Sequence, residues 1–177
     1  MTDSFKCRVC DKIHDGLPRS FAADFPDMYA DMSREVRDAR ASIGSDQCVI
    51  DQQWFFIRGC LEIPVRGSSE PFLWGLWASV RKEVYDEISE SWEEPGREKT
   101  RGPFKGRLAN SLSVYADTLN LKTKILVQPV GTRPLFVIEE EHALAVEQKS
   151  GISEDRVQEL AALLLHQQKP GWPSEFS

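Results

Sequence analysis

The segment between Cys48 and Val80 is the most apolar and aromatic part of the chain, and it constrains the fold more than any other part. Side chains of a β-strand alternate between two faces, and residues 54–63 place apolar side chains or glycine at every second position. Residues 72–79 repeat this alternation after a short turn, which predicts an antiparallel hairpin. A shorter strand at residues 48–51 would extend the hairpin to a three-stranded meander.

Further elements are predicted on both sides of this segment. Apolar residues recur at helical spacing in three places, and two short apolar runs have the composition of strands. The polar, glycine-rich segment 93–106 is expected to be a loop. The helices are expected over residues 28–43, over residues 81–92 and after an N-cap at Ser153, and the strands over residues 122–130 and 133–139.

Together these elements predict an α+β fold. The expected architecture is a mainly antiparallel sheet of about five strands, flanked by helices and preceded by an N-terminal CxxC knuckle-like segment at residues 1–20. A length of 177 residues with 41% hydrophobic residues suits one core, so residues 1–177 are predicted to form a single domain. Residues 168–177 are expected to be a loosely ordered tail.

The charge balance bears on the partners of the protein. A formal net charge of -6 argues against broad affinity for nucleic acid, which requires lysine and arginine to neutralise phosphates. An acidic surface instead suits a basic protein partner. No apolar run approaches the length of a membrane span, and the first residues lack the apolar segment of a signal peptide. We therefore expect a cytoplasmic protein without a nucleic-acid or membrane partner, and the oligomeric state stays open.

The chain has four cysteines, and the pair Cys7 and Cys10 is the most informative. A disulfide framework is not expected in a reducing compartment. Two thiolates at CxxC spacing can reach one tetrahedral zinc ion from a tight turn, and His14 can supply a third ligand from the same segment. Bound metal would also hold down an N-terminal segment that has little apolar content. Residues 1–20 are therefore predicted to bind structural zinc.

A fourth zinc ligand would have to come from the central strands, as Cys48 or Cys60. Their relative orientation depends on the loop before Trp54. A two-residue loop would turn them to opposite faces, whereas a three-residue loop would place them on the same face. Either cysteine could instead be a small buried side chain without a ligand role, and this interpretation is favoured for Cys60 in the middle of its strand.

Two histidines outside the N-terminal segment are given a structural interpretation. His166 lies at the end of the last predicted helix, where a positive charge is favourable, so it needs no chemical role. His142 follows the acidic run 139–141, and acidic residues at the start of a helix are stabilised by the helix dipole alone.

Several motifs together resemble a bacterial protein family grouped as domain of unknown function 2199. They are, in order, CRVC with His14, DQCVID, FFIRGCLEIPV, FLWGLWASV, RPLFVIEEEHALA and the SGIS helix start. The resemblance implies a compact α+β domain whose role is unassigned, and it places Cys7, Cys10, His14 and Cys48 on the family's cysteine and histidine positions. One departure is Asp11, which stands where a glycine is expected after the CxxC pair.

Two functions from different classes follow. The preferred one is a non-enzymatic domain with structural zinc that acts through protein contact, as an immunity or regulatory partner of a basic protein. It rests on the negative charge and on the absence of a phosphate-binding glycine loop, a nucleophile elbow and an HExxH helix from the sequence. The alternative is a small zinc-dependent or cysteine-dependent enzyme that uses Cys7, Cys10 and His14. Three protein ligands with an open fourth position would favour the enzyme, and four ligands would favour structure.

Overall fold

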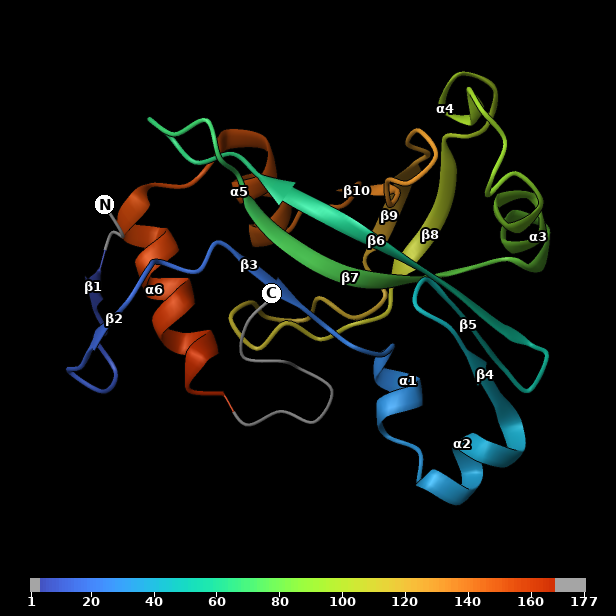
Figure 1. Ribbon diagram of the computed structural model, residues 1–177, viewed down its shortest axis with the longest axis horizontal. Coiled ribbons are helices and arrows are strands. Elements are labelled where there is room, and N and C mark those ends of the chain that lie inside the picture. Colours follow the sequence, from blue (N-terminus) through green and yellow to red (C-terminus); the bar gives the residue numbers. More distant parts are fainter. Residues whose placement is uncertain (1–3, 168–177) are drawn as a thin grey trace.

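The computed structural model describes residues 4–167, and a strongly twisted β-sheet forms its centre (Figure 1). The strands are β1 (Phe5–Lys6), β2 (Ile13–His14), β3 (Ser20–Ala22), β4 (Ala41–Ile43), β5 (Gln47–Ile50), β6 (Trp54–Ile63), β7 (Phe72–Val80), β8 (Phe104–Leu108), β9 (Lys122–Leu126) and β10 (Leu135–Ile138). The helices are α1 (Asp27–Ala30), α2 (Arg34–Arg40), α3 (Lys82–Glu90), α4 (Arg97–Thr100), α5 (Ala143–Ser150) and α6 (Glu154–Leu165). The predicted tail 168–177 lies outside the described residues.

Five of the strands form a closed barrel. The pairing runs β7–β8–β9–β10–β6, and β6 pairs with β7 to complete the ring. The pair β10–β6 is parallel and the other four pairs of the ring are antiparallel. Outside the ring, β3 is added to β7 in parallel, and β5 and then β4 are added to β6 in antiparallel.

The predicted open sheet of about five mainly antiparallel strands is therefore wrong. The sequence identified the β6–β7 hairpin, but it could not identify the contact by which β10 returns to β6 and closes the ring. That approach depends on Gly59, because a Cβ atom there would lie 2.4 Å from the ring of Phe136 and 2.7 Å from the carbonyl oxygen of Pro134. In addition, α4 lies inside the segment 93–106, which was expected to be a loop, and β8 begins inside it.

The helix predicted over residues 28–43 is also interrupted. Its first part is the single turn α1, and Ser33 starts α2 by accepting a hydrogen bond from the backbone N–H of Val36. Residues 41–43 leave the helix and pair with β5 as strand β4. The helical spacing of apolar residues in this segment was misleading, because the sheet edge takes up Ala41 and Ile43 instead.

The alternation predicted for the central hairpin is confirmed. Ile57, Leu61 and Ile63 of β6 are fully buried in the main core, together with residues of β7, the other barrel strands and α6. A second and smaller buried cluster contains Cys48, Phe56 and Trp77 on the opposite face of the same strands.

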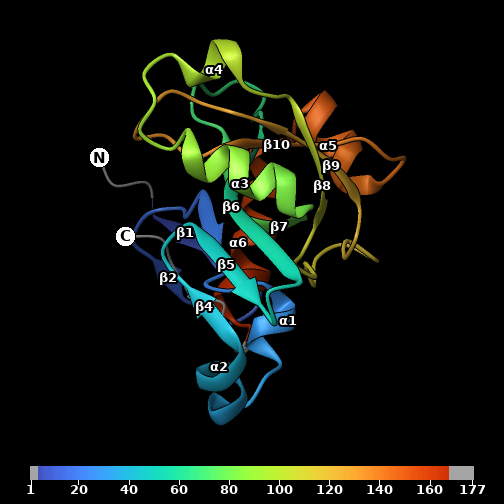
Figure 2. The same cartoon turned by 90° about the vertical axis from the view of Figure 1, so that its right-hand side faces the viewer.

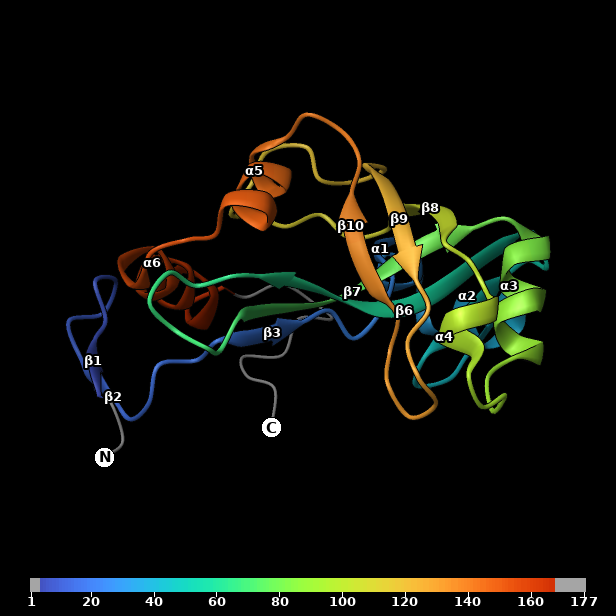
Figure 3. The same ribbon diagram turned by 90° about the horizontal axis from the view of Figure 1, so that it is seen from above.

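The helices lie around the barrel at different ends. α3 covers one end of β6, where the rings of Phe55 and Tyr85 are 5.3 Å apart (Figure 2). α6 lies at the opposite end of the molecule, next to the small hairpin β1–β2 (Figures 1 and 3). Among residues 4–167, no helix combines the length and the apolar character that a membrane span requires.

Candidate metal centre

The N-terminal knuckle is a hairpin whose turn carries the CxxC pair. β1 and β2 pair in antiparallel register, with Phe5 opposite His14. The backbone N–H of Cys7 donates to the carbonyl of Lys12 (2.9 Å), and the N–H of Asp11 donates to the carbonyl of Cys7 (3.0 Å). Asp11 has a φ of 57°, a left-handed conformation that aspartate tolerates better than most residues. Glycine adopts such a conformation most easily, which is why a glycine was expected at that position.

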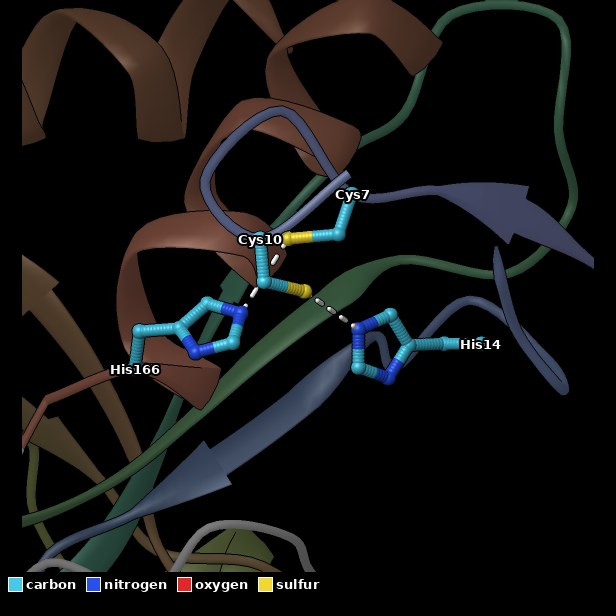
Figure 4. Close-up of side chains that lie close together, drawn as sticks. All are labelled: Cys7, Cys10, His14 and His166. Atoms are coloured by element: carbon cyan, nitrogen blue, oxygen red, sulfur yellow. Dashed lines mark hydrogen bonds between the residues drawn. The ribbon is translucent and has the colours of Figure 1, made fainter. Parts of the chain in front are cut away.

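Four side chains converge at this knuckle: Cys7, Cys10, His14 and His166 (Figure 4). One possible ligand atom of each residue lies within 4.8 Å of the corresponding atoms of the other three. Cys7 Sγ lies 3.2 Å from His166 Nε2, and Cys10 Sγ lies 3.4 Å from His14 Nε2. We call this group the Cys–His cluster.

The spacing of the Cys–His cluster is close to that of a tetrahedral metal site. With metal–sulfur and metal–nitrogen bonds of about 2.3 and 2.0 Å, two donor atoms of a filled zinc tetrahedron are roughly 3.3 to 3.8 Å apart. The two shortest sulfur–nitrogen contacts are at or near this range, and the upper limit of 4.8 Å exceeds it by about 1 Å. Small side-chain rotations would therefore be enough to bring all four donors onto one ion.

The surroundings of the Cys–His cluster stabilise thiolate and orient the imidazoles. Burial alone would raise the pKa of Cys7, but hydrogen bonds from the backbone N–H groups of Cys10 and Val9 and the contact with His166 lower the pKa to about 7. The thiolate is the form that binds metals. The ring of Phe5 stacks on His14 at a centroid distance of 5.4 Å, which limits the positions that this imidazole can take.

The two cysteines of the central strands lie elsewhere. The loop 51–53 has three residues, so Cys48 pairs with Phe56 and shares a strand face with Cys60. Neither cysteine belongs to the Cys–His cluster. Cys48 is fully buried in the smaller core cluster, and burial raises the pKa of its thiol to about 12. Cys48 therefore has the environment of a core residue, the alternative that the sequence had left open.

The sequence argument missed His166. This residue directly follows α6, and it reaches the knuckle although 159 positions separate it from Cys7. A signal was present in the residue counts, because the chain has only three histidines. His142 is already used as the N-cap of α5, where its Nδ1 accepts a hydrogen bond from the backbone N–H of Leu144 (3.0 Å).

The donor set of two thiols and two imidazoles determines what the centre can do. Cys₂His₂ is a common ligand set of structural zinc sites, in which four protein ligands leave no position open for substrate. The four donors come from the knuckle and from the end of α6, so a bound ion would join the first and the last described parts of the chain (Figure 1).

Comparison with known proteins identifies one match. A family described as uncharacterised protein conserved in bacteria (DUF2199) matches residues 6–152, which is more than half of the chain. The matched segment contains Cys7, Cys10 and His14 and ends before His166. No curated protein and no solved structure matches the chain.

Proposed function

The chain belongs to the bacterial family DUF2199, and from that premise we propose that it is a domain with one structural zinc ion held by Cys7, Cys10, His14 and His166. The observation that carries the proposal is the convergence of four metal-binding side chains from two distant parts of the sequence. Zinc suits the site because two sulfur and two nitrogen donors in tetrahedral arrangement are typical of this ion.

The local structure explains why this part of the fold would need a metal ion. β1 and β2 have two residues each, and a two-stranded hairpin of this size is not stable by itself in water. Zinc binding contributes about 10 to 16 kcal/mol of apparent free energy in small zinc-finger peptides, where it drives folding. The ion would therefore fasten the knuckle to the end of α6. A reducing compartment such as the cytoplasm would keep both thiols available for it.

The same donor set weighs against the alternative of a zinc-dependent or cysteine-dependent enzyme. A catalytic zinc site keeps one position for water or substrate, and His166 would fill that position here. With both thiolates bound to the ion, neither Cys7 nor Cys10 would be free as a nucleophile.

The zinc content of protein purified without chelator tests the proposal. Elemental mass spectrometry should find one zinc per chain in the wild type and none in the Cys7→Ser/Cys10→Ser variant. His166→Ala should weaken zinc binding at least about tenfold, because a ligand is lost. The matched control is His142→Ala, which removes a histidine from outside the Cys–His cluster and should leave the zinc content unchanged.

The same experiment separates the two functions. If wild-type protein contains no metal, the zinc proposal fails. If zinc is present and His166→Ala binds it as tightly as the wild type, the ion has three protein ligands and an open position, which would favour the enzyme.

We further propose that the domain acts by contacting a basic protein, with α3 as part of the contact surface. Val84 and Ile88 of α3 face the core, whereas Glu83 and Glu90 are exposed. Within the described part of the chain, neither of these two carboxylates forms an ion pair. Asp86 and Glu87 of the same helix are paired with Lys82 and Arg101, so the unpaired negative charge of α3 lies on Glu83 and Glu90. Such a surface favours a partner rich in lysine and arginine through long-range attraction.

Affinity capture from a bacterial extract tests this contact. At low salt the immobilised wild-type domain should retain a basic protein, and high salt should release it because surface charges are screened. Glu83→Lys/Glu90→Lys should abolish retention. Glu62→Lys/Glu70→Lys has the same net charge but changes exposed acids on the central hairpin, and it should retain the partner. Equal retention by both variants would contradict a contact through α3.

A further inference from the structure

A pocket of about 450 Å³ has Cys60 of β6 in its lining. The other elements next to it, α4 and the β9–β10 turn, lie away from α6 and the β1–β2 hairpin, which carry the Cys–His cluster (Figures 1 and 3). The walls of the pocket are Cys60 of β6, Asp46 in the turn before β5, the residues Trp92, Glu93 and Arg97, and the β9–β10 turn at residues 130–133. The volume is within the range of small-molecule sites. Residues far apart in the sequence thus line a pocket, open to solvent, that has no role in the proposed zinc site.

The walls of the pocket are fixed by Arg97, whose side chain is almost completely buried at 2% exposure. Its guanidinium donates to the carbonyl oxygens of Trp92 (2.6 Å), Gln128 (2.8 Å) and Thr132 (3.1 Å) and lies 5.0 Å from the centre of the Trp92 ring. These bonds tie the segment after α3 to the β9–β10 turn. Among residues 4–167, no carboxylate lies at ion-pair distance from Arg97, so its positive charge is stabilised by carbonyl dipoles and by the face of the Trp92 ring.

A second arginine offers hydrogen-bond donors to the pocket. Arg133 Nε donates to Asp46 Oδ1 at 2.5 Å. Its two terminal NH₂ groups have no acceptor among the described residues, and this pair of nitrogens can hold a carboxylate in bidentate geometry. Asp46 occupies only the Nε of Arg133, and its other oxygen accepts from the Ser45 hydroxyl at 2.6 Å. Glu93, the other acid of the lining, is exposed.

Arg58 places a further guanidinium group near Arg133. Burial lowers the pKa of Arg58, and the nearby charge of Arg133 lowers it further, while Asp24 and Asp46 partly oppose the effect. The carboxylate of Asp46 already lies near both guanidinium groups, which lower its pKa, so the terminal nitrogens of Arg133 are the donors that remain for a further anion.

From these contacts we propose that the pocket binds a small organic carboxylate, with its carboxylate on the terminal nitrogens of Arg133 and its apolar part against the indole of Trp92. The rigid frame made by Arg97 lowers the entropic cost of binding, because the two loops that form the walls are already tied together. Cys60 lines the same pocket and serves as a chemical reporter of what enters it.

Competing alkylation of Cys60 tests this proposal. Iodoacetate carries a carboxylate, whereas iodoacetamide has nearly the same size and no charge. Both react by attack of the thiolate sulfur on the CH₂ carbon, which forms a C–S bond and releases iodide. Because both reagents consume the same thiolate, the ratio of their rates does not depend on the raised pKa of Cys60. Peptide mass spectrometry measures each rate at each cysteine.

The measured quantity is the rate with iodoacetate divided by the rate with iodoacetamide. For Cys60 of the wild type we expect this ratio to be about tenfold higher than for free N-acetylcysteine. A tenfold increase corresponds to one anion contact worth about 1.4 kcal/mol. The iodoacetate rate should also saturate with reagent concentration. Arg133→Gln should return the ratio to the reference value, and Arg107→Gln, a change at an exposed arginine of β8, should leave it high.

Two controls keep the outcome decisive. Arg133→Gln/Asp46→Asn removes both partners of the ion pair, so a low ratio in this variant cannot come from an uncovered Asp46 carboxylate. Cys48 is fully buried and should stay unlabelled while a variant remains folded. A wild-type ratio equal to that of N-acetylcysteine overturns the proposal, whether or not the variants fold. An equally high ratio in folded Arg133→Gln also overturns it.

Discussion

Gly59 is the residue at which the barrel closes. An added Cβ would lie 2.4 Å from the Phe136 ring and 2.7 Å from the Pro134 carbonyl oxygen, and the latter is backbone that cannot rotate away. We therefore expect Gly59→Ala to lower the free energy of unfolding by at least about 2 kcal/mol through overpacking. Urea unfolding followed by tryptophan fluorescence measures this change.

The matched control for this prediction is Gly44→Ala. The nearest atom to a Cβ at that position is the Gln47 carbonyl oxygen at 4.0 Å, so a change within about 0.5 kcal/mol is expected. Equal effects of the two substitutions would mean that the close approach of β10 to β6 is not what makes Gly59 necessary.

Cys48 gives the stability of the protein a specific pH dependence. Its pKa is about 12 in the folded protein because of burial, and an unfolded cysteine has a pKa of about 8.5. Its contribution to stability is therefore complete below pH 8.5 and is lost as the pH rises toward 12, because only the unfolded state ionises in that range. The free energy of unfolding should fall more steeply between pH 8.5 and 10.5 in the wild type than in Cys48→Ala, by up to about 1.4 kcal/mol per pH unit.

Urea titrations at several pH values measure these slopes. The packing lost in Cys48→Ala lowers the free energy of unfolding by an amount that does not depend on pH. Only the difference in slope between the two proteins therefore measures the ionisation of the thiol. Parallel curves for the two proteins would contradict the buried environment of Cys48.

Residues that act locally were predictable from the sequence, and residues that act over long distances were not. Cys7, Cys10 and His14 lie in one short hairpin. Asp11, which stands where a glycine was expected, has a left-handed backbone conformation there. His166 is separated from Cys7 by 159 positions, and no local pattern relates the two. Only the donor count of a tetrahedral site, applied to the few histidines of the chain, could have pointed to it.

At the scale of elements, the β1–β2 hairpin should depend on the metal. Its turn bonds, from Cys7 N–H to Lys12 and from Asp11 N–H to Cys7, lie in a segment with two-residue strands. We expect a zinc chelator to speed hydrogen exchange of residues 5–14 at least about tenfold, because local opening then costs much less free energy. Exchange in the β6–β7 hairpin, deep in the core, should change little.

Hydrogen exchange followed by mass spectrometry, with and without chelator, makes this comparison. The Cys7→Ser/Cys10→Ser variant is the control, since chelator should have no effect on it. Unchanged protection of residues 5–14 after metal removal would mean that packing alone, including the burial of Phe5 and Cys7, holds the hairpin in place.

Elements that depend on local signals were predictable from the sequence, and elements that depend on long-range contacts were not. The β6–β7 hairpin and α6, with its Ser153 cap, were predicted because alternation and capping are local signals. The parallel pairing of β10 with β6 joins positions about 75 apart, and short β8 lies in a polar segment, so neither left a pattern that could be recognised. An open sheet was the simplest arrangement of the strands that the sequence pattern predicted. Closing the barrel requires the pairing of β10 with β6, which no sequence pattern indicated.

At the scale of the whole molecule, a metal ion would link positions 7 and 166 and so tie nearly the full described chain together. Most of the largest fully buried side chains, among them Trp74, Trp77 and Phe136, belong to barrel strands, and none belongs to the knuckle. We therefore expect metal-free protein to keep a folded barrel and to unfold at a lower temperature. A ligand that binds only the folded state adds about 1.4 kcal/mol for each tenfold excess over its dissociation constant.

For a domain of this size, that increment corresponds to a rise of about 3 to 6 °C in the melting temperature for each tenfold increase in free zinc. Differential scanning calorimetry in zinc-buffered solutions measures the rise, and the melting temperature of Cys7→Ser/Cys10→Ser should not respond. If residues 1–177 form a single domain, the zinc-bound protein should show one transition whose calorimetric and van't Hoff enthalpies agree. Two separate transitions, of which only one responds to zinc, would mean that the knuckle with α6 and the barrel unfold as independent units.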